Sequence, residues 1–133
     1  MITILVHLVL WILYSGFEGI REGYYFNCFP KPAKPDIHVL FTLQRLTVIL
    51  VMCATSPLIF LAMALMFPFF HDGFYYATRH KLNVVVYQKG FWSDPSSTST
   101  ALLNFKLKDR ILMLVGSVVI IITYFILHNI NIL

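Results

Sequence analysis

The stretch LTVILVMCATSPLIFLAMALMFPFF, residues 46–70, contains no charged side chain and decides how the rest of the chain is threaded. A spanning helix needs about 20 apolar residues, so the whole stretch could form one long tilted span. Serine and proline, however, are favoured as the N-cap and the first residue of a helix. Ser56-Pro57 therefore indicates a helix start, and we expect a hairpin in which two spans meet.

The composition is typical of a membrane protein. Of the 133 residues, 59% are hydrophobic and 12% are charged, whereas an ordinary soluble domain has about 45–50% and 25%. Residues 2–17 and 111–130 also carry no formal charge. The first of these stretches lacks the basic segment of a secretory signal, so we expect it to be retained as a span.

The distribution of lysine and arginine separates the two threadings. With the hairpin, all ten basic residues lie in one half of the protein, whereas a single kinked central span divides them six against four. Cytoplasmic loops of membrane proteins carry the excess of these residues. We therefore predict four spans in a bacterial inner membrane or its equivalent, with both termini outside and both basic loops in the cytoplasm.

The predicted fold is an all-α integral membrane protein, a four-helix transmembrane bundle with short loops that forms one domain over 1–133. The alternative is three spans with one long kinked central helix. Spans are expected at about 2–25, 36–55, 57–82 and 110–131, with a cytoplasmic loop at 83–109. In that loop, residues 84–92 predict a short strand or an interfacial segment, and Ser96–Thr100 predict a cap for a helix over 102–108.

Ionisable residues of the first three helices are expected at a similar depth, near the cytoplasmic boundary of the bilayer. Such groups are costly in hydrocarbon unless they are paired, so they normally face the bundle interior and mark either a site or a structural ion pair. The candidate cluster consists of Glu18, Arg21, Glu22, His38, Arg45, His71, Asp72, Arg79 and His80.

A metal centre is the sharper interpretation of this cluster. Carboxylates and imidazoles on facing helices hold paired iron or manganese in four-helix bundles. The spacing departs from the usual pattern, because neither glutamate is followed by histidine three residues later. The predicted ligands, for iron, manganese or zinc, are Glu18, Glu22, His38, Asp72 and His80.

The basic residues before the last span suggest a second kind of contact. Lys106, Lys108 and Arg110 are predicted to receive a lipid phosphate at the cytoplasmic surface. The simpler interpretation is that they only anchor the span at the headgroups. Because topology explains the basic balance, we expect the lipid bilayer, and no nucleic acid, as a partner.

Two functions follow from these patterns. The first is a small polytopic subunit or scaffold of a membrane assembly, either a homo-oligomer or a larger complex. The second is a membrane-embedded, metal-dependent enzyme acting on a lipid or a quinone-like substrate. Size favours the first function, because a loop of about 27 residues is too short to form a catalytic domain.

Overall fold

The computed structural model describes residues 2–28, 37–52, 56–95 and 104–130. In this part of the chain, four α-helices and one short 3₁₀ helix are formed. They are α1 (Ile2–Cys28), α2 (Ile37–Met52), α3 (Pro57–Leu82), η1 (Gly90–Trp92) and α4 (Leu107–Asn129). The all-α prediction is confirmed.

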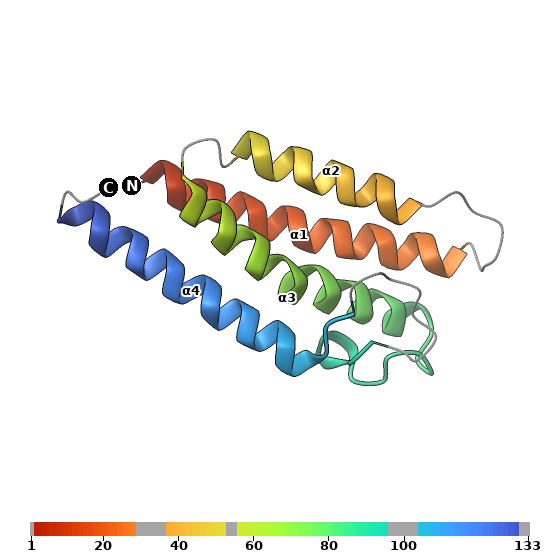
Figure 1. Cartoon of the computed structure of the whole chain (residues 1–133). Helices are drawn as coiled ribbons and strands as arrows, with labels where there is room; N and C mark the ends of the chain where they lie inside the picture. The colour runs from red at the N-terminus through yellow and green to blue at the C-terminus, as the bar shows by residue number, and fades with distance from the viewer. Residues whose placement is uncertain (1, 29–36, 53–55, 96–103, 131–133) are drawn as a thin grey trace.

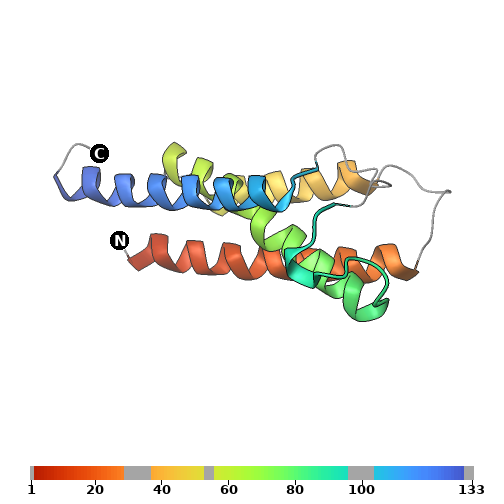
Figure 2. The same ribbon diagram turned by 90° about the horizontal axis from the view of Figure 1, so that it is seen from below.

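The helices form an up-and-down bundle. Figure 1 shows each helix antiparallel to the next, with the two ends of the chain at the same end of the molecule. Seen from below in Figure 2, α3 passes obliquely between α4 and α1. We call the opposite end, where α1 and α3 finish and α4 begins, the basic end of the bundle.

The hairpin between α2 and α3 is confirmed. Ser56 has extended backbone angles (φ −156°, ψ 122°) and Pro57 is the first helical residue. The Ser56 carbonyl accepts a hydrogen bond from the Phe60 amide at 3.0 Å, which completes the first turn of α3. The alternative of one long kinked central helix is therefore not formed, although residues 53–55 lie outside the described part of the chain.

Three helices, α1, α3 and α4, are long and apolar enough to cross a membrane. With 16 residues, α2 is shorter, about 24 Å at a rise of ~1.5 Å per residue. The part of α2 over Phe41–Leu50 is apolar. These lengths are consistent with a membrane protein, as the composition predicts.

The contact between α1 and α3 depends on glycine. Gly16, Gly19 and Gly23 lie along one side of α1, at three- and four-residue spacing. A Cβ atom on Gly19 would overlap the carbonyl oxygen of His71, and one on Gly23 would come within 2.8 Å of Cβ of Thr78. Small residues at this spacing let the backbones of membrane helices approach closely.

The apolar core lies between the first halves of α1 and α3, with one contribution from α2. Trp11 is completely buried, and its indole nitrogen donates a hydrogen bond of 2.8 Å to the carbonyl oxygen of Met63. That bond leaves no unpaired indole N–H in the core, where it would be costly. The buried core residues are Leu8, Trp11, Ile49, Ile59, Met63 and Met66.

The segment after α3 does not form the strand that was one of its two predictions, and the interfacial segment stays a prediction. No strand forms over residues 84–92, because Tyr87 and Gly90 have positive φ angles (52° and 54°) that interrupt an extended run. The chain instead turns back onto α3, where the ring of Phe91 occupies the space in which a Cβ on Gly73 would lie.

The start of α4 also differs from its prediction. Residues 104–106 are not helical, and α4 begins at Leu107. The Asp109 carboxylate accepts a hydrogen bond of 3.1 Å from the amide of Lys106, the N-cap residue. Asp94 accepts another of 2.6 Å from the amide of Leu107, which ties the loop to the helix start. The predicted cap at 96–100 lies outside the described residues.

Candidate functional site

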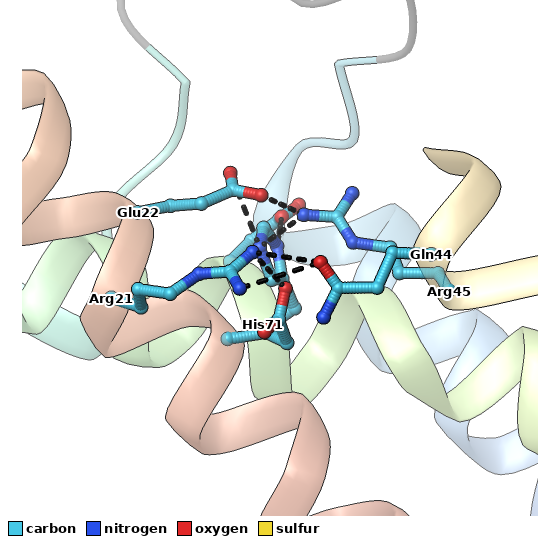
Figure 3. A network of polar contacts seen from close by, with 7 residues as sticks. Arg21, Glu22, Gln44, Arg45 and His71 are labelled. Atoms are coloured by element: carbon cyan, nitrogen blue, oxygen red, sulfur yellow. Dashed lines mark hydrogen bonds and ion pairs between the residues drawn. The ribbon is translucent and has the colours of Figure 1, made fainter. Parts of the chain in front are cut away.

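A buried polar cluster joins α1, α2 and α3 (Figure 3). A terminal nitrogen of the Arg45 guanidinium is ion-paired with Glu22 and lies 2.9 Å from Nε2 of His71. The same imidazole nitrogen is 3.4 Å from the second Glu22 oxygen. On the other side of the ring, Nδ1 of His71 is 2.8 Å from a carboxylate oxygen of Asp72. We call Glu22, Arg45, His71 and Asp72 the central cluster.

The glycine contact places Glu22 in this cluster. Gly19 and Gly23 lie one turn before and one residue after Glu22, and both are packed against α3. Glu22 therefore emerges in the seam between α1 and α3, where it is only 4% exposed. His71 is equally buried on the facing side, at 6%. A buried carboxylate requires a partner, and Arg45 from α2 supplies it.

A second pair lies beside the central cluster. Arg21 donates a hydrogen bond of 2.6 Å to Glu18, one turn earlier on the same helix, and lies 3.4 Å from the amide oxygen of Gln44 on α2. Its guanidinium is also 4.5 Å from the centre of the Phe41 ring. Glu18 is buried, whereas the Arg21 side chain is 44% exposed. This pair therefore lies at the edge of the bundle.

An aromatic ring covers the apolar side of the central cluster. Phe67 stacks on His71 with ring centroids 4.8 Å apart. The Arg45 guanidinium lies 4.8 Å from the same ring, a distance typical of a cation–π contact. The ring thus compensates part of the cost of removing a guanidinium from water.

The fourth helix contributes Arg110, which is completely buried. Its guanidinium donates hydrogen bonds to the carbonyl oxygens of Ser93 (2.7 Å) and Phe91 (3.4 Å), and lies 5.1 Å from the Tyr76 ring. Arg110 also interacts electrostatically with Asp72. It therefore holds the η1 loop on the bundle.

This position of Arg110 changes the lipid-phosphate prediction. The guanidinium is turned inward, because the segment before α4 folds over it and supplies its acceptors, so it does not face the surface. Lys106 and Lys108, in contrast, are exposed. The prediction of a headgroup contact therefore narrows to these two lysines.

Two other predicted cluster residues, Arg79 and His80, lie further along α3. Arg79 and His80 are seven and eight residues beyond Asp72, more than ~10 Å further along α3. Nδ1 of His80 lies 3.3 Å from the Val86 carbonyl oxygen in the following loop. His38 belongs to α2, but its side chain lies outside what the structure describes.

The predicted metal ligands whose side chains the structure describes, Glu18, Glu22, Asp72 and His80, are not grouped around one point. Within the described ranges, no three side chains of His, Cys, Asp or Glu are grouped so that they could hold a metal ion. Glu18 and Glu22 are each engaged by an arginine, and His80 is turned to the loop. The metal hypothesis therefore finds no support among the described contacts.

Each of the three carboxylates in and beside the central cluster has a partner. Glu18 is ion-paired with Arg21 and Glu22 with Arg45, and a carboxylate oxygen of Asp72 lies 2.8 Å from Nδ1 of His71. Opposite charges that compensate one another at short range make burial near the bilayer tolerable.

Several contributors to the site were not predicted from the sequence. The glycines that create the seam were readable as a small-residue pattern, since Gly19 and Gly23 are four residues apart. No pattern in the sequence indicates that Gln44 and Phe67 lie beside charged groups. Their positions there depend on how the helices pack against one another.

A scan against protein-family models and searches of curated proteins and of solved structures find no match for this chain. No family is therefore assigned, and the function is inferred from the geometry of the bundle.

Proposed function

We propose that this chain is a small integral membrane subunit or scaffold of a membrane assembly, in which the buried charges fix how the helices pack. The observation that carries this proposal is the pairing of every carboxylate in and beside the central cluster with a basic group or an imidazole. Buried ion pairs of this kind serve to specify register and partner more than to add stability.

The outer surfaces of the helices support the same proposal. Large apolar side chains are exposed along both α1 and α4. In a bilayer, such faces contact acyl chains or the helices of a second membrane protein. They include Leu5, Val9, Leu13 and Phe17 on α1, and Leu112, Val115, Val119, Ile122 and Ile126 on α4.

The orientation we propose follows from the lysines at the basic end. Lys81, Lys89, Lys106 and Lys108 are all exposed there. Positive residues beside spans are retained in the cytoplasm. The basic end would then face the cytoplasm of a bacterial inner membrane or its equivalent, with both chain ends outside.

The subunit proposal is tested by the mass of the protein extracted from its native membrane. Native mass spectrometry of an affinity-tagged chain in lipid nanodiscs should show a discrete species of fixed stoichiometry, larger than the 15.4 kDa monomer. Substituting Val119→Asn on the exposed face of α4, and separately Leu13→Asn on α1, would show which face carries the contact. A monodisperse monomer in all extracts would contradict the proposal.

A metal-dependent enzyme acting on a lipid or quinone-like substrate is the competing function. Elemental analysis of the purified protein beside Glu22→Ala and His80→Ala variants separates the two. We expect no stoichiometric iron, manganese or zinc, because arginines already engage the glutamates. A stoichiometric metal that is lost in both variants would overturn the subunit proposal.

A further inference from the structure

His71 differs from every other member of the central cluster in its chemistry. Histidine is the side chain that ordinarily gains a proton between about pH 8 and pH 5. Carboxylate oxygens of Glu22 and Asp72 lie 3.4 Å and 2.8 Å from its two ring nitrogens, and Arg45 lies 2.9 Å from Nε2. An added proton therefore changes which of these groups the ring attracts and which it repels.

The contacts of the neutral ring define its tautomer. Asp72 accepts a hydrogen bond, so Nδ1 carries the proton and donates it across 2.8 Å. Nε2 is then unprotonated and accepts a hydrogen bond from Arg45 at 2.9 Å. Glu22, whose oxygen is 3.4 Å from Nε2, is an acceptor as well and makes no hydrogen bond to it in this state.

A second proton on the ring reverses these roles. Nε2 then carries a hydrogen and can no longer accept from Arg45, so two cations would lie 2.9 Å apart. The protonated ring would also compete with Arg45 for the Glu22 carboxylate. Repulsion between like charges is strong in a poorly hydrated interior. Arg45, which comes from α2, is the group that must move.

A route for the proton exists at the partner of His71. The Asp72 side chain is 21% exposed, whereas the His71 side chain is 8% exposed. Asp72 lies directly against Nδ1, so it connects the buried ring to the surface of the bundle.

Two other contacts between described side chains of α2 and α1 are longer. Gln44 meets the half-exposed Arg21 at 3.4 Å, and Phe41 meets Tyr25 edge to face at 6.3 Å. Ile49 is the buried apolar residue that α2 contributes to the core. Among the described side chains of α2, Arg45 is therefore the one that makes the closest polar contact with both α1 and α3.

We propose that His71 is a proton-dependent latch, in which protonation releases Arg45 and detaches α2 from α1 and α3. The groups that face the ring are Glu22 from α1, Arg45 from α2, and Asp72 and Phe67 from α3 itself. From α4, Arg110 interacts electrostatically with Asp72, which contacts the ring. The latch goes beyond the subunit role and does not require an assembly.

Pulsed electron–electron spin resonance on the full-length chain in nanodiscs tests the latch. Spin labels replace Leu43 on α2 and Tyr24 on α1, both exposed, in a background with Cys28→Ser and Cys53→Ser. Lowering the pH from about 8 to about 5.5 should lengthen and broaden this distance distribution. A second pair, at Tyr24 and Lys81, reports on α1 and α3 and should remain unchanged.

Two variants assign the response to one ring. His71→Gln cannot gain a proton, so its α1–α2 distance should be independent of pH. His80→Gln removes another histidine of α3 and should keep the wild-type response. Nitrogen-15 spectra of wild-type histidines supply a measurement that needs no variant: His71 should change from the Nδ1–H tautomer to the doubly protonated ring as α2 moves.

An α1–α2 distance that is the same at both pH values would overturn the latch, as would a response that survives in His71→Gln. A His71 ring that is doubly protonated at both pH values would overturn it as well. None of these outcomes alters the mass of the extracted protein, so the subunit proposal is tested separately.

Discussion

The contacts of α1 with α3 and with α2 differ in the residues that form them. Against α3, glycines bring the two backbones together, and Gly19 lies directly beneath the His71 carbonyl oxygen. Against α2, long side chains reach across, with Arg45 on Glu22 and Gln44 on Arg21. The first contact depends on shape and is insensitive to charge. The second consists of charged and polar side chains, so it is the one that a change of charge affects directly.

The largest loss of stability is expected when one charge of the α1–α2 contact is removed. Glu22→Gln keeps the shape of the side chain but leaves the largely buried Arg45 without its counter-ion. Breaking a buried pair in this way costs roughly 3–5 kcal/mol. Unfolding of the variant in detergent, followed by circular dichroism, would measure the loss. A loss below about 1 kcal/mol would mean that the pair is dispensable.

Adding a single methyl group tests the α1–α3 contact, which depends on shape. Gly19→Ala places a Cβ against the His71 carbonyl oxygen, and overpacking of this kind typically costs about 1–3 kcal/mol. Gly116→Ala on α4 is the matched control, because its Cβ would meet only Leu65 at an ordinary 3.9 Å. We expect the control to be neutral or slightly stabilising in the same unfolding assay, since alanine is the better helix former. Equal effects at the two positions would contradict the glycine seam.

The loss expected from breaking the contact between Arg110 of α4 and the η1 loop is intermediate in size. Arg110→Gln removes the donor that reaches the Ser93 carbonyl oxygen, and hydrogen bonds to charged groups contribute roughly 1.5–3 kcal/mol. Limited proteolysis between residues 84 and 95 should become faster, because the η1 loop loses its attachment. Lys108→Gln, an exposed neighbour on the same helix, should leave the cleavage rate unchanged. Similar rates in the two variants would show that Arg110 does not hold the loop.

The smallest effect is expected at the edge of the bundle. Arg21→Gln removes the partner of Glu18, but the arginine side chain is 44% exposed, so water and salt weaken the pair. Exposed pairs usually contribute less than about 1 kcal/mol. The stability of this variant should differ little from the wild type, and the difference should shrink further at high salt. A loss as large as that of Glu22→Gln would remove the distinction between the edge pair and the central cluster.

The order and direction of the helices were predictable because they follow from local rules. Ser56-Pro57 marks a helix start in any context, and counting residues from it places His71 at the level of Arg45. The partners were not predictable from counting, because they depend on how each helix is rotated. Glu22 therefore faces Arg45 instead of joining a set of metal ligands.

Contacts between segments far apart in the chain could not be predicted from the sequence either. Arg110 meets the carbonyl oxygen of Ser93, 17 residues earlier, only because the η1 loop folds over the start of α4. The positive φ of Tyr87, which prevents the expected strand, also belongs to that loop. The α1–α3 seam, by contrast, was available from the spacing of Gly19 and Gly23.

The most direct test of the account is a double-mutant cycle between Glu22 and Arg45, with Glu22→Gln, Arg45→Gln and the combined variant in one unfolding assay. If the pair holds α2 on the bundle, the effects will be non-additive, with a coupling energy of about 1–3 kcal/mol. The combined variant should then lose less stability than the two single variants lose together. Effects that add to within about 0.5 kcal/mol would contradict the claim that this ion pair joins the helices.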